Sequence, residues 1–177
     1  MTWAVPTRRR FAALAAAGLT ACVGVTSLAR AQPGPLRTVT VASGLSHPWS
    51  LAFLPDGRML VTERDGRLRV VSAAGALSPP VAGLPRVDAQ GQGGLFDVLP
   101  AADFAQSRRI FLSYAEPGTG VEAGRNGTSV GSGVLSPDLA TLTQWQVLFR
   151  QTPKVASAGH FGGRLVLAGN RLFVTLG

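Results

Sequence analysis

Short apolar runs that alternate with tight-turn residues recur along this chain, and they restrict it to β-structure. The run Trp49–Leu54 is followed by Pro55-Asp56-Gly57 and then by a second run, Arg58–Glu63. Because proline presets the backbone for a turn and glycine tolerates a positive φ, we predict strand, turn, strand. The same pattern predicts strands at 36–42, 67–71, 94–99, 109–114, 163–167 and 171–175, with further strand material over 130–151.

These strand-turn-strand units repeat at irregular spacing, which favours the blades of a β-propeller. Strand endings such as Leu60-Val61-Thr62 and Phe173-Val174-Thr175 are alike in size and polarity. The 22 glycines and 12 prolines supply turns, and no long amphipathic helix is visible beyond the first 31 residues. The predicted fold class is therefore all-β, with a β-sandwich as the alternative. Asn126-Gly127-Thr128 matches a glycosylation sequon, but we expect it to form a turn.

Residues 1–31 have the features of a secretory signal peptide. Three consecutive arginines precede an apolar run from Ala12 to Leu28, which ends at Ala29-Arg30-Ala31. A basic start, an apolar middle and an A-x-A end form a cleavable export signal, so the mature chain is expected to start at Gln32. The paired arginines favour the twin-arginine variant over an arginine-rich Sec signal. We therefore expect residues 32–177 to form one domain that is periplasmic or secreted.

Two other interpretations of this leader remain. Leu19-Thr20-Ala21-Cys22 resembles a bacterial lipobox, in which case a lipid on Cys22 would attach the protein to a membrane. A single membrane helix over 11–28 is the second, although the cleavage site argues against it. Cys22 is the only cysteine of the chain, so we expect no disulfide in the exported domain.

The charge distribution gives no support for a nucleic-acid partner. The chain has 17 Lys and Arg against 9 Asp and Glu, and four of the arginines lie in the leader, which contains no acid. The remainder therefore carries 13 basic and 9 acidic residues, a net charge of +4, with its arginines scattered. Nucleic-acid binding needs a basic stripe with interleaved aromatic residues, so we exclude it from the expected functions.

The stretch Gly159–Leu167 places one histidine, His160, before two glycines and an apolar strand. An imidazole takes up a proton reversibly near neutral pH, so a histidine at the mouth of a hairpin can serve as a general base for a ligand. A histidine between small residues is also compatible with an ordinary turn. On the residues alone, both interpretations of His160 remain open.

Four stretches together resemble the glucose/sorbosone dehydrogenase family, the soluble aldose dehydrogenases that depend on pyrroloquinoline quinone (PQQ). These stretches are Gly44–Trp49 with Phe53–Gly57, Gly91–Leu95 with Asp103-Phe104, Phe149–Lys154, and His160–Leu165. Their order and spacing match the family from about Leu36 to Gly177. Each stretch alone is weak evidence, and the four in sequence are specific.

The resemblance implies a six-bladed β-propeller that holds PQQ near its axis, usually with calcium. It implies that His160 is the general base, which takes the proton from the anomeric hydroxyl of an aldose while hydride passes to the quinone. Gln92 would line the sugar and quinone site, where its amide can both donate and accept. Arg164 is a further candidate for substrate or cofactor binding, although it can instead pair with an acid or cap a strand end.

The expected function is therefore oxidation of an aldose sugar to a lactone, with the electrons passed to an external acceptor. A non-catalytic or lactonase-type propeller fragment is the alternative. The family usually has a polar residue before the histidine, whereas this chain has Gly159, which removes one hydrogen bond to the sugar. Trp49 is assigned to the core, and no physical reason places Asp97 or Asp103 in the site.

After the leader, the chain has about half the length of the family's catalytic domain. We therefore expect an N-terminal part of the propeller, of two to three blades, whose activity is incomplete in this chain. The calcium ligands that the family implies would lie beyond Gly177. An open half-propeller would also leave Leu172–Leu176 as an unpaired apolar edge strand, which favours aggregation.

Overall fold

The computed structural model describes residues 36–177, and residues 39–177 form one compact unit that holds every strand described below. The predicted signal peptide over 1–31, together with Cys22 and the lipobox and membrane-helix alternatives, lies outside the described residues and stays a prediction. Within the described residues, no helix is both long and apolar enough to cross a membrane.

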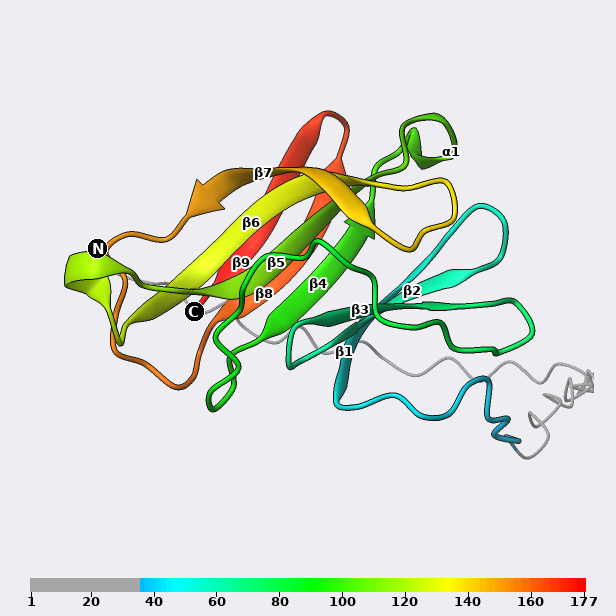
Figure 1. Ribbon diagram of the computed structural model, residues 1–177, viewed down its shortest axis with the longest axis horizontal. Coiled ribbons are helices and arrows are strands. Elements are labelled where there is room, and N and C mark those ends of the chain that lie inside the picture. The colour runs from blue at the N-terminus through cyan, green and yellow to red at the C-terminus, as the bar shows by residue number, and fades with distance from the viewer. Residues whose placement is uncertain (1–35) are drawn as a thin grey trace, which may run out of the picture. The chain divides into compact units, whose positions relative to one another are not determined.

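The described residues form three antiparallel sheets, in which each strand is hydrogen-bonded to the next along the chain (Figure 1). The first sheet contains β1 (Pro48–Phe53), β2 (Met59–Glu63) and β3 (Arg67–Val71). The second contains β4 (Leu95–Pro100), β5 (Arg109–Pro117), β6 (Asn126–Leu135) and β7 (Leu142–Arg150). The third contains β8 (Gly162–Ala168) and β9 (Arg171–Leu176). A short helix α1 (Phe104–Ser107) lies in the connection between β4 and β5, and a 3-10 turn η1 (Gly120–Glu122) lies in the connection between β5 and β6.

The three sheets meet through their first strands. Strand β4 packs against β1 and β2 on one side and against β8 on the other. Each sheet is an antiparallel meander, and meanders that follow one another along the chain and pack against each other are typical of the blades of a β-propeller. The predicted all-β propeller class is thus confirmed, and the two to three blades expected correspond to three sheets in the described residues.

The core lies between the first and second sheets. It gathers large apolar side chains from β2 to β6, most of them with no exposed surface: Leu60, Leu68, Leu95, Ile110, Leu112, Tyr114 and Leu135. Strand β2 is buried at all five positions, and β6 at nine of its ten positions. A strand that is buried on both faces has apolar residues at consecutive positions rather than at every second one. This is why continuous apolar runs in the sequence predicted these strands correctly.

Two sequence-based expectations about local structure were wrong. Residues 36–45 are irregular rather than a strand over 36–42, and Val39 and Val41 are 75% and 59% exposed. A β-branched alternation specifies a strand only when one face can be buried, and these side chains find no such surface. Asn126-Gly127-Thr128 does not form a turn: it begins β6, and all three residues are buried.

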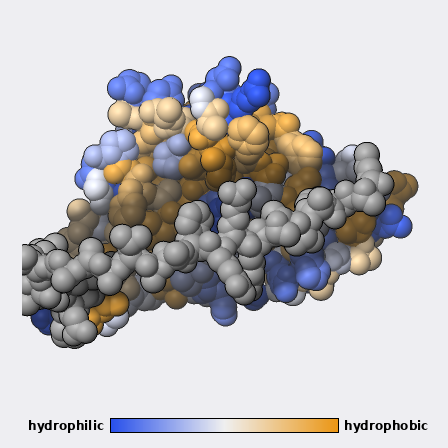
Figure 2. All heavy atoms as spheres, turned by 180° about the vertical axis from the view of Figure 1, so that it is seen from behind, coloured by the Kyte–Doolittle hydropathy of each residue, from blue (hydrophilic) through white to orange (hydrophobic). Residues whose placement is uncertain are grey.

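The third sheet is open on its far side, as expected for residues 172–176. Among the described residues, β9 pairs only with β8, and Phe173 and Leu176 are 53% and 47% exposed. Other large apolar side chains are also exposed: Leu51, Phe53, Leu148, Phe149 and Val166. Figure 2 shows that apolar residues cover part of one face of the molecule. Aggregation through this edge stays a prediction.

Candidate functional site

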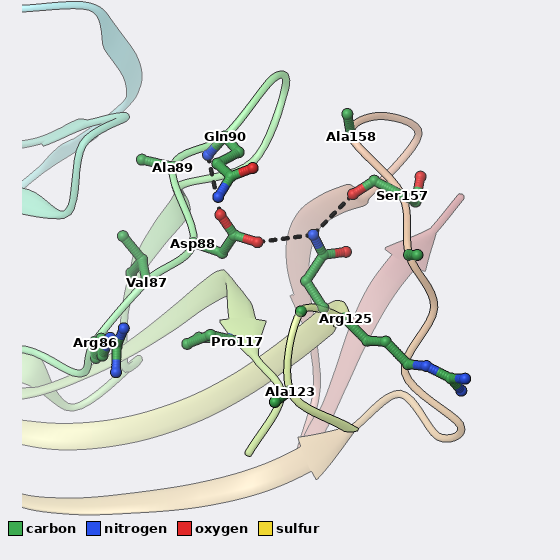
Figure 3. Close-up of a pocket in the computed structure, with 14 residues that line it drawn as sticks. Arg86, Val87, Asp88, Ala89, Gln90, Pro117, Ala123, Arg125, Ser157 and Ala158 are labelled. Atoms are coloured by element: carbon green, nitrogen blue, oxygen red, sulfur yellow. Dashed lines mark hydrogen bonds between the residues drawn. The ribbon is translucent and has the colours of Figure 1, made fainter. Parts of the chain in front are cut away.

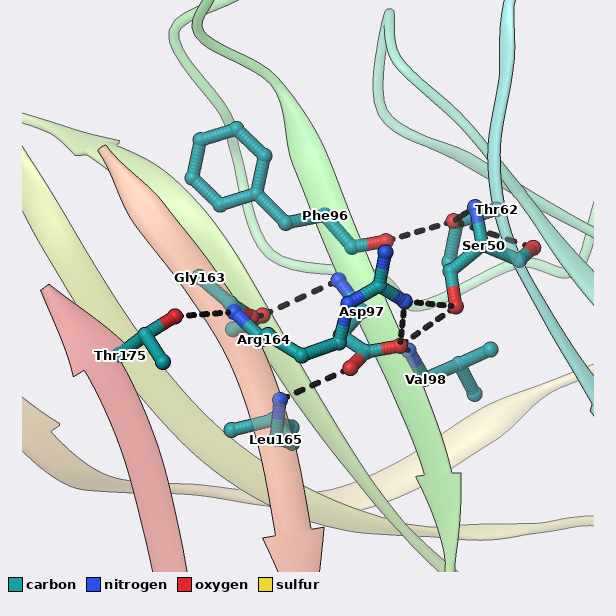
Figure 4. A network of polar contacts seen from close by, with 10 residues as sticks. Ser50, Thr62, Phe96, Asp97, Val98, Gly163, Arg164, Leu165 and Thr175 are labelled. Atoms are coloured by element: carbon teal, nitrogen blue, oxygen red, sulfur yellow. Dashed lines mark hydrogen bonds and ion pairs between the residues drawn. The ribbon is translucent and has the colours of Figure 1, made fainter. Parts of the chain in front are cut away.

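The site lies where three first strands begin. Gln92 belongs to the segment that leads into β4, His160 to the segment that leads into β8, and Trp49 is the second residue of β1. Figure 4 shows the strands that carry Asp97 and Leu165 side by side and running in the same direction. The starts of adjacent parallel strands lie at one edge, so residues 68 positions apart along the chain come into contact.

Gln92 and His160 are joined directly. The backbone N–H of His160 donates to Oε1 of Gln92 at 2.9 Å, and the backbone N–H of Gln92 donates to the carbonyl of Ala158 at 2.7 Å. With Oε1 engaged, the Nε2 group of Gln92 remains a donor for a ligand. His160 has a φ of 60°, in the left-handed region that non-glycine residues rarely adopt, and its side chain is exposed. The structure thus places two of the three predicted site residues together.

A hollow of about 410 Å³ lies beside these two residues, and it is lined by Trp49, Arg64, Gln92, Phe96, His160, Phe161 and Gly162. Three of the lining rings form a row: the Trp49 and Phe96 centroids are 5.5 Å apart, as are those of Phe96 and Phe161. Arg64 is held in place because Nη1 donates to the carbonyl of Gly91 at 2.8 Å. The hollow therefore combines an aromatic wall, a fixed cation, an amide and an imidazole.

Two glycines make this packing possible. A Cβ at Gly163, where φ is 88°, would lie 2.6 Å from the Phe96 ring, so only glycine allows the ring to pack on this strand. A Cβ at Gly159 would lie 2.9 Å from Oε1 of Gln92. A larger residue at position 159 would therefore force the Gln92 amide to move. Gly159 thus leaves space for the amide that accepts from His160.

Arg164 does not line the hollow but lies behind Trp49, with its guanidinium carbon 4.5 Å from the ring centroid. Its Nη1 lies 3.3 Å from Oδ1 of Asp97. Arg164 therefore pairs with an acid, which is one of the alternatives that the sequence left open. Asp97 also accepts hydrogen bonds from the hydroxyl of Ser50 and, at 2.8 Å, from the backbone N–H of Leu165 (Figure 4). One carboxylate thus joins all three sheets directly below the site, and a binding role for Arg164 stays a prediction.

Sequence reasoning missed three residues of this site. Trp49, assigned to the core, is half-buried and lines the hollow, and Arg64 was not considered. Asp97 was given no role, although an acid within the apolar run Leu95–Leu99 is itself a signal, since a buried charge needs partners. Among residues 36–177, no three His, Cys, Asp or Glu side chains gather closely enough to hold a metal ion.

The segment between β7 and β8 is anchored by a buried cation. Lys154, the only lysine of the chain, is 5% exposed, and its Nζ lies 2.7 Å from Oε2 of Glu116. Arg150 and Ser129 also donate to Glu116. Burial raises the pKa of the Glu116 carboxyl, but the hydrogen bonds from Lys154, Arg150 and Ser129 outweigh it and hold the pKa below the ordinary 4.5. The carboxylate and the ammonium therefore fix the chain at Lys154, six residues before His160.

We expect this ion pair to make stability depend on acid pH. Because the pKa of Glu116 is lower in the folded chain than in the unfolded one, its contribution is present above about pH 4.5 and is lost as pH falls through the lowered value. The free energy of unfolding in urea should therefore differ between the wild type and Glu116→Gln at neutral pH, and this difference should shrink below about pH 4. A difference that stays constant across this range would contradict the assignment.

Comparison with known proteins identifies relatives of this chain. The family model described as Glucose / Sorbosone dehydrogenase matches residues 45–177. Over 149 residues the chain is 51% identical to the aldose sugar dehydrogenase YliI of Escherichia coli strain K12, which covers 83% of this chain and 39% of that protein. A crystal structure of a glucose dehydrogenase matches with a TM-score of 0.74 and 54% identity, over 78% of this chain and 40% of that one. The PQQ-bound form of an aldose sugar dehydrogenase from Streptomyces coelicolor matches with a TM-score of 0.61 and 26% identity, over 72% and 36% of the two chains.

The chain thus spans about two fifths of the length of these relatives. The matched range nevertheless contains every residue of the hollow, the Asp97 junction and the buried Lys154 pair. A family model that covers 133 of the 177 residues, together with a relative at 51% identity, establishes the relationship. The chain belongs to the glucose/sorbosone dehydrogenase family.

Proposed function

We propose that this chain carries one part of the active site of a PQQ-dependent aldose dehydrogenase, which oxidises an aldose to a lactone and passes the electrons to an external acceptor. The observation that carries the proposal is the hydrogen bond between the backbone of His160 and the amide of Gln92 at the edge of the hollow. The names of the relatives support the substrate class, since they are aldose sugar dehydrogenases and a glucose dehydrogenase.

The residues of the hollow suit PQQ, which is a planar, anionic quinone. Trp49, which packs on the buried ring of Phe96, offers an aromatic face to a flat ring system, and Arg64 offers a cation to a carboxylate. The PQQ-bound relative supports this cofactor at the level of the family. The calcium ion implied by the resemblance has no cluster of ligating side chains among residues 36–177, and it stays a prediction.

Each side chain then has a distinct task. The imidazole of His160 takes the proton of the anomeric hydroxyl, a role that needs an exposed ring held at a fixed position. The free Nε2 group of Gln92 donates to an oxygen of the sugar or the cofactor, while its Oε1 stays bound to His160. When bound, the quinone supplies the acceptor for the hydride that leaves the same carbon.

A chimera tests this proposal, because it supplies the part of the fold that the relatives have beyond the matched region. Residues 45–177 would replace the matching segment of the Escherichia coli relative, and the product would be loaded with PQQ and calcium. We expect aldose-dependent reduction of a redox dye with release of lactone. Bound PQQ without any turnover would favour a non-catalytic propeller, and hydrolysis of added lactones would favour a lactonase.

We further infer a periplasmic or secreted location from the leader, which lies outside the described residues. The proposal rests on the basic, apolar and A-x-A pattern of residues 1–31. N-terminal sequencing of the protein recovered outside the cytoplasm is expected to begin at Gln32. A mature chain that starts instead at Cys22, with a lipid attached to this cysteine, would establish the lipoprotein alternative.

A further inference from the structure

Asn126, the first residue of β6, connects the two segments that carry the candidate catalytic groups. Its side chain is 4% exposed, and Nδ2 donates to Oδ2 of Asp88 and to the carbonyl of Ser157, each at 2.8 Å. Figure 3 shows these bonds as dashed lines that lead from Asp88 and from Ser157 to one amide between them. Asp88 lies four residues before Gln92, and Ser157 lies three residues before His160.

The orientation of this amide is set by chemistry. A carboxylate oxygen and a carbonyl oxygen can only accept hydrogen bonds, so the group between Asp88 and Ser157 has to be the NH₂ group. The backbone of Asn126 also exchanges two hydrogen bonds with Val155, both at 2.9 Å. Further along β6, the hydroxyl of Thr128 donates to the carbonyl of Phe161 at 2.6 Å. The start of β6 therefore holds the His160 segment on both sides of His160.

The Asp88 arm extends this support to the Gln92 segment. Oδ1 of Asp88 accepts from the backbone N–H of Gln90, and its own N–H donates to the carbonyl of Ala115 on β5. These bonds lie beside a pocket of about 900 Å³, seen in Figure 3, that reaches neither Gln92 nor His160. Asn126 is buried, Asp88 is half-buried, and neither of them lines the hollow, so the pair can act on the site only through the two segments.

We propose that Asn126 and Asp88 are positioning residues, which fix Gln92 and His160 relative to each other. The contact that they set is the 2.9 Å bond between the backbone of His160 and Oε1 of Gln92, reinforced by the 2.7 Å bond from Gln92 to Ala158. A shift of one segment against the other would break both bonds and displace the imidazole. This inference rests on the proposed function for its catalytic meaning, but the positioning itself can be measured without turnover.

Hydrogen exchange of the chain tests the positioning directly. Asn126→Asp keeps the size of the side chain but removes both donors and sets a carboxylate against Asp88. We expect amide exchange to become about tenfold faster in residues 86–93 and 155–160, the change that loss of one buried hydrogen bond produces, while β5 is unchanged. Thr143→Val is the matched control, since it deletes a hydroxyl that donates to Val134 at the other end of β6. This control should leave both segments as in the wild type.

A second variant distinguishes a local effect on the two segments from a general loss of stability. Asp88→Ala leaves Asn126 in place and removes only the arm to the Gln92 segment, so it should accelerate exchange at Gln92 and at His160. Because Asn126→Asp already breaks the bond between Asn126 and Asp88, adding Asp88→Ala should not accelerate exchange any further in residues 155–160. The proposal is overturned if neither segment responds, or if β5 accelerates together with the segments in both variants.

The same substitution in the chimera separates this inference from the proposed function. Asn126→Asp should lower kcat for aldose about tenfold while PQQ still binds, and Thr143→Val should not. If the parent chimera oxidises no aldose but the exchange pattern is as expected, the proposed function fails and the positioning role stands. If the chimera is active and exchange in the two segments is unaffected, the positioning role fails alone.

Discussion

Replacing His160 with alanine is expected to lower aldose-dependent dye reduction by the chimera about 10²–10⁴-fold, the range that a positioned general base contributes. The reason is that no other described side chain lining the hollow can take up a proton near neutral pH: its remaining members are aromatic, amide, guanidinium or glycine. Binding of PQQ should change little, since the aromatic wall and Arg64 remain. Steady-state rates with saturating aldose, together with a PQQ titration, make the measurement.

The chain offers a matched control, because its second histidine shares the exposure and the backbone of the first. His47 is also exposed and has a φ of 46°, but it does not line the hollow. His47→Ala should therefore retain turnover. Equal losses in the two variants would mean that histidine at a left-handed position matters only for the local backbone, and His160 would lose its assigned role.

Replacing Asp97 with alanine is expected to lower the free energy of unfolding by about 3 kcal/mol, because it leaves buried donors without partners. The hydroxyl of Ser50 and the backbone N–H of Leu165 are both buried and both donate to this carboxylate. The exposed arm of Arg164 adds little, since its side chain is 55% exposed and its charge is screened. Urea unfolding followed by fluorescence measures the loss.

Asp103→Ala is the control for this second prediction. Asp103 is exposed, and its carboxylate accepts only from the exposed hydroxyl of Ser107, so its loss should change stability by less than about 0.5 kcal/mol. If the Asp97 and Asp103 variants unfold alike, the contacts between the three sheets do not depend on this carboxylate.

Most of the strands could be predicted from the sequence, because buried strands appear in it as apolar runs between turn residues. The expected strand over 67–71 is β3 residue for residue, and those at 109–114 and 171–175 lie within β5 and β9. The prediction of a strand over 36–42 was wrong because the alternating apolar side chains of this segment have no surface to pack against. The prediction of a turn at Asn126 was also wrong. A polar residue followed by glycine is typical of a turn, and the sequence does not show that buried partners accept the hydrogen bonds of this amide.

The site could be predicted only in part. The resemblance pointed to Gln92 and His160, and the structure shows how they meet, through a backbone N–H and an amide oxygen. Trp49 stands at the start of β1 and Arg64 directly follows the end of β2, and no spacing along the chain reveals that these strand ends lie at the edge that carries the site. These side chains are placed by contacts between segments that lie far apart in the sequence, and local sequence patterns do not reveal such contacts.

The central claim, that these residues form part of a PQQ-dependent aldose dehydrogenase, is tested most directly by aldose oxidation in the chimera. With PQQ and calcium present, we predict dye reduction that requires both aldose and PQQ, yields lactone, and is lost in His160→Ala but kept in His47→Ala. A folded chimera that binds PQQ and reduces no dye with any aldose would contradict the claim.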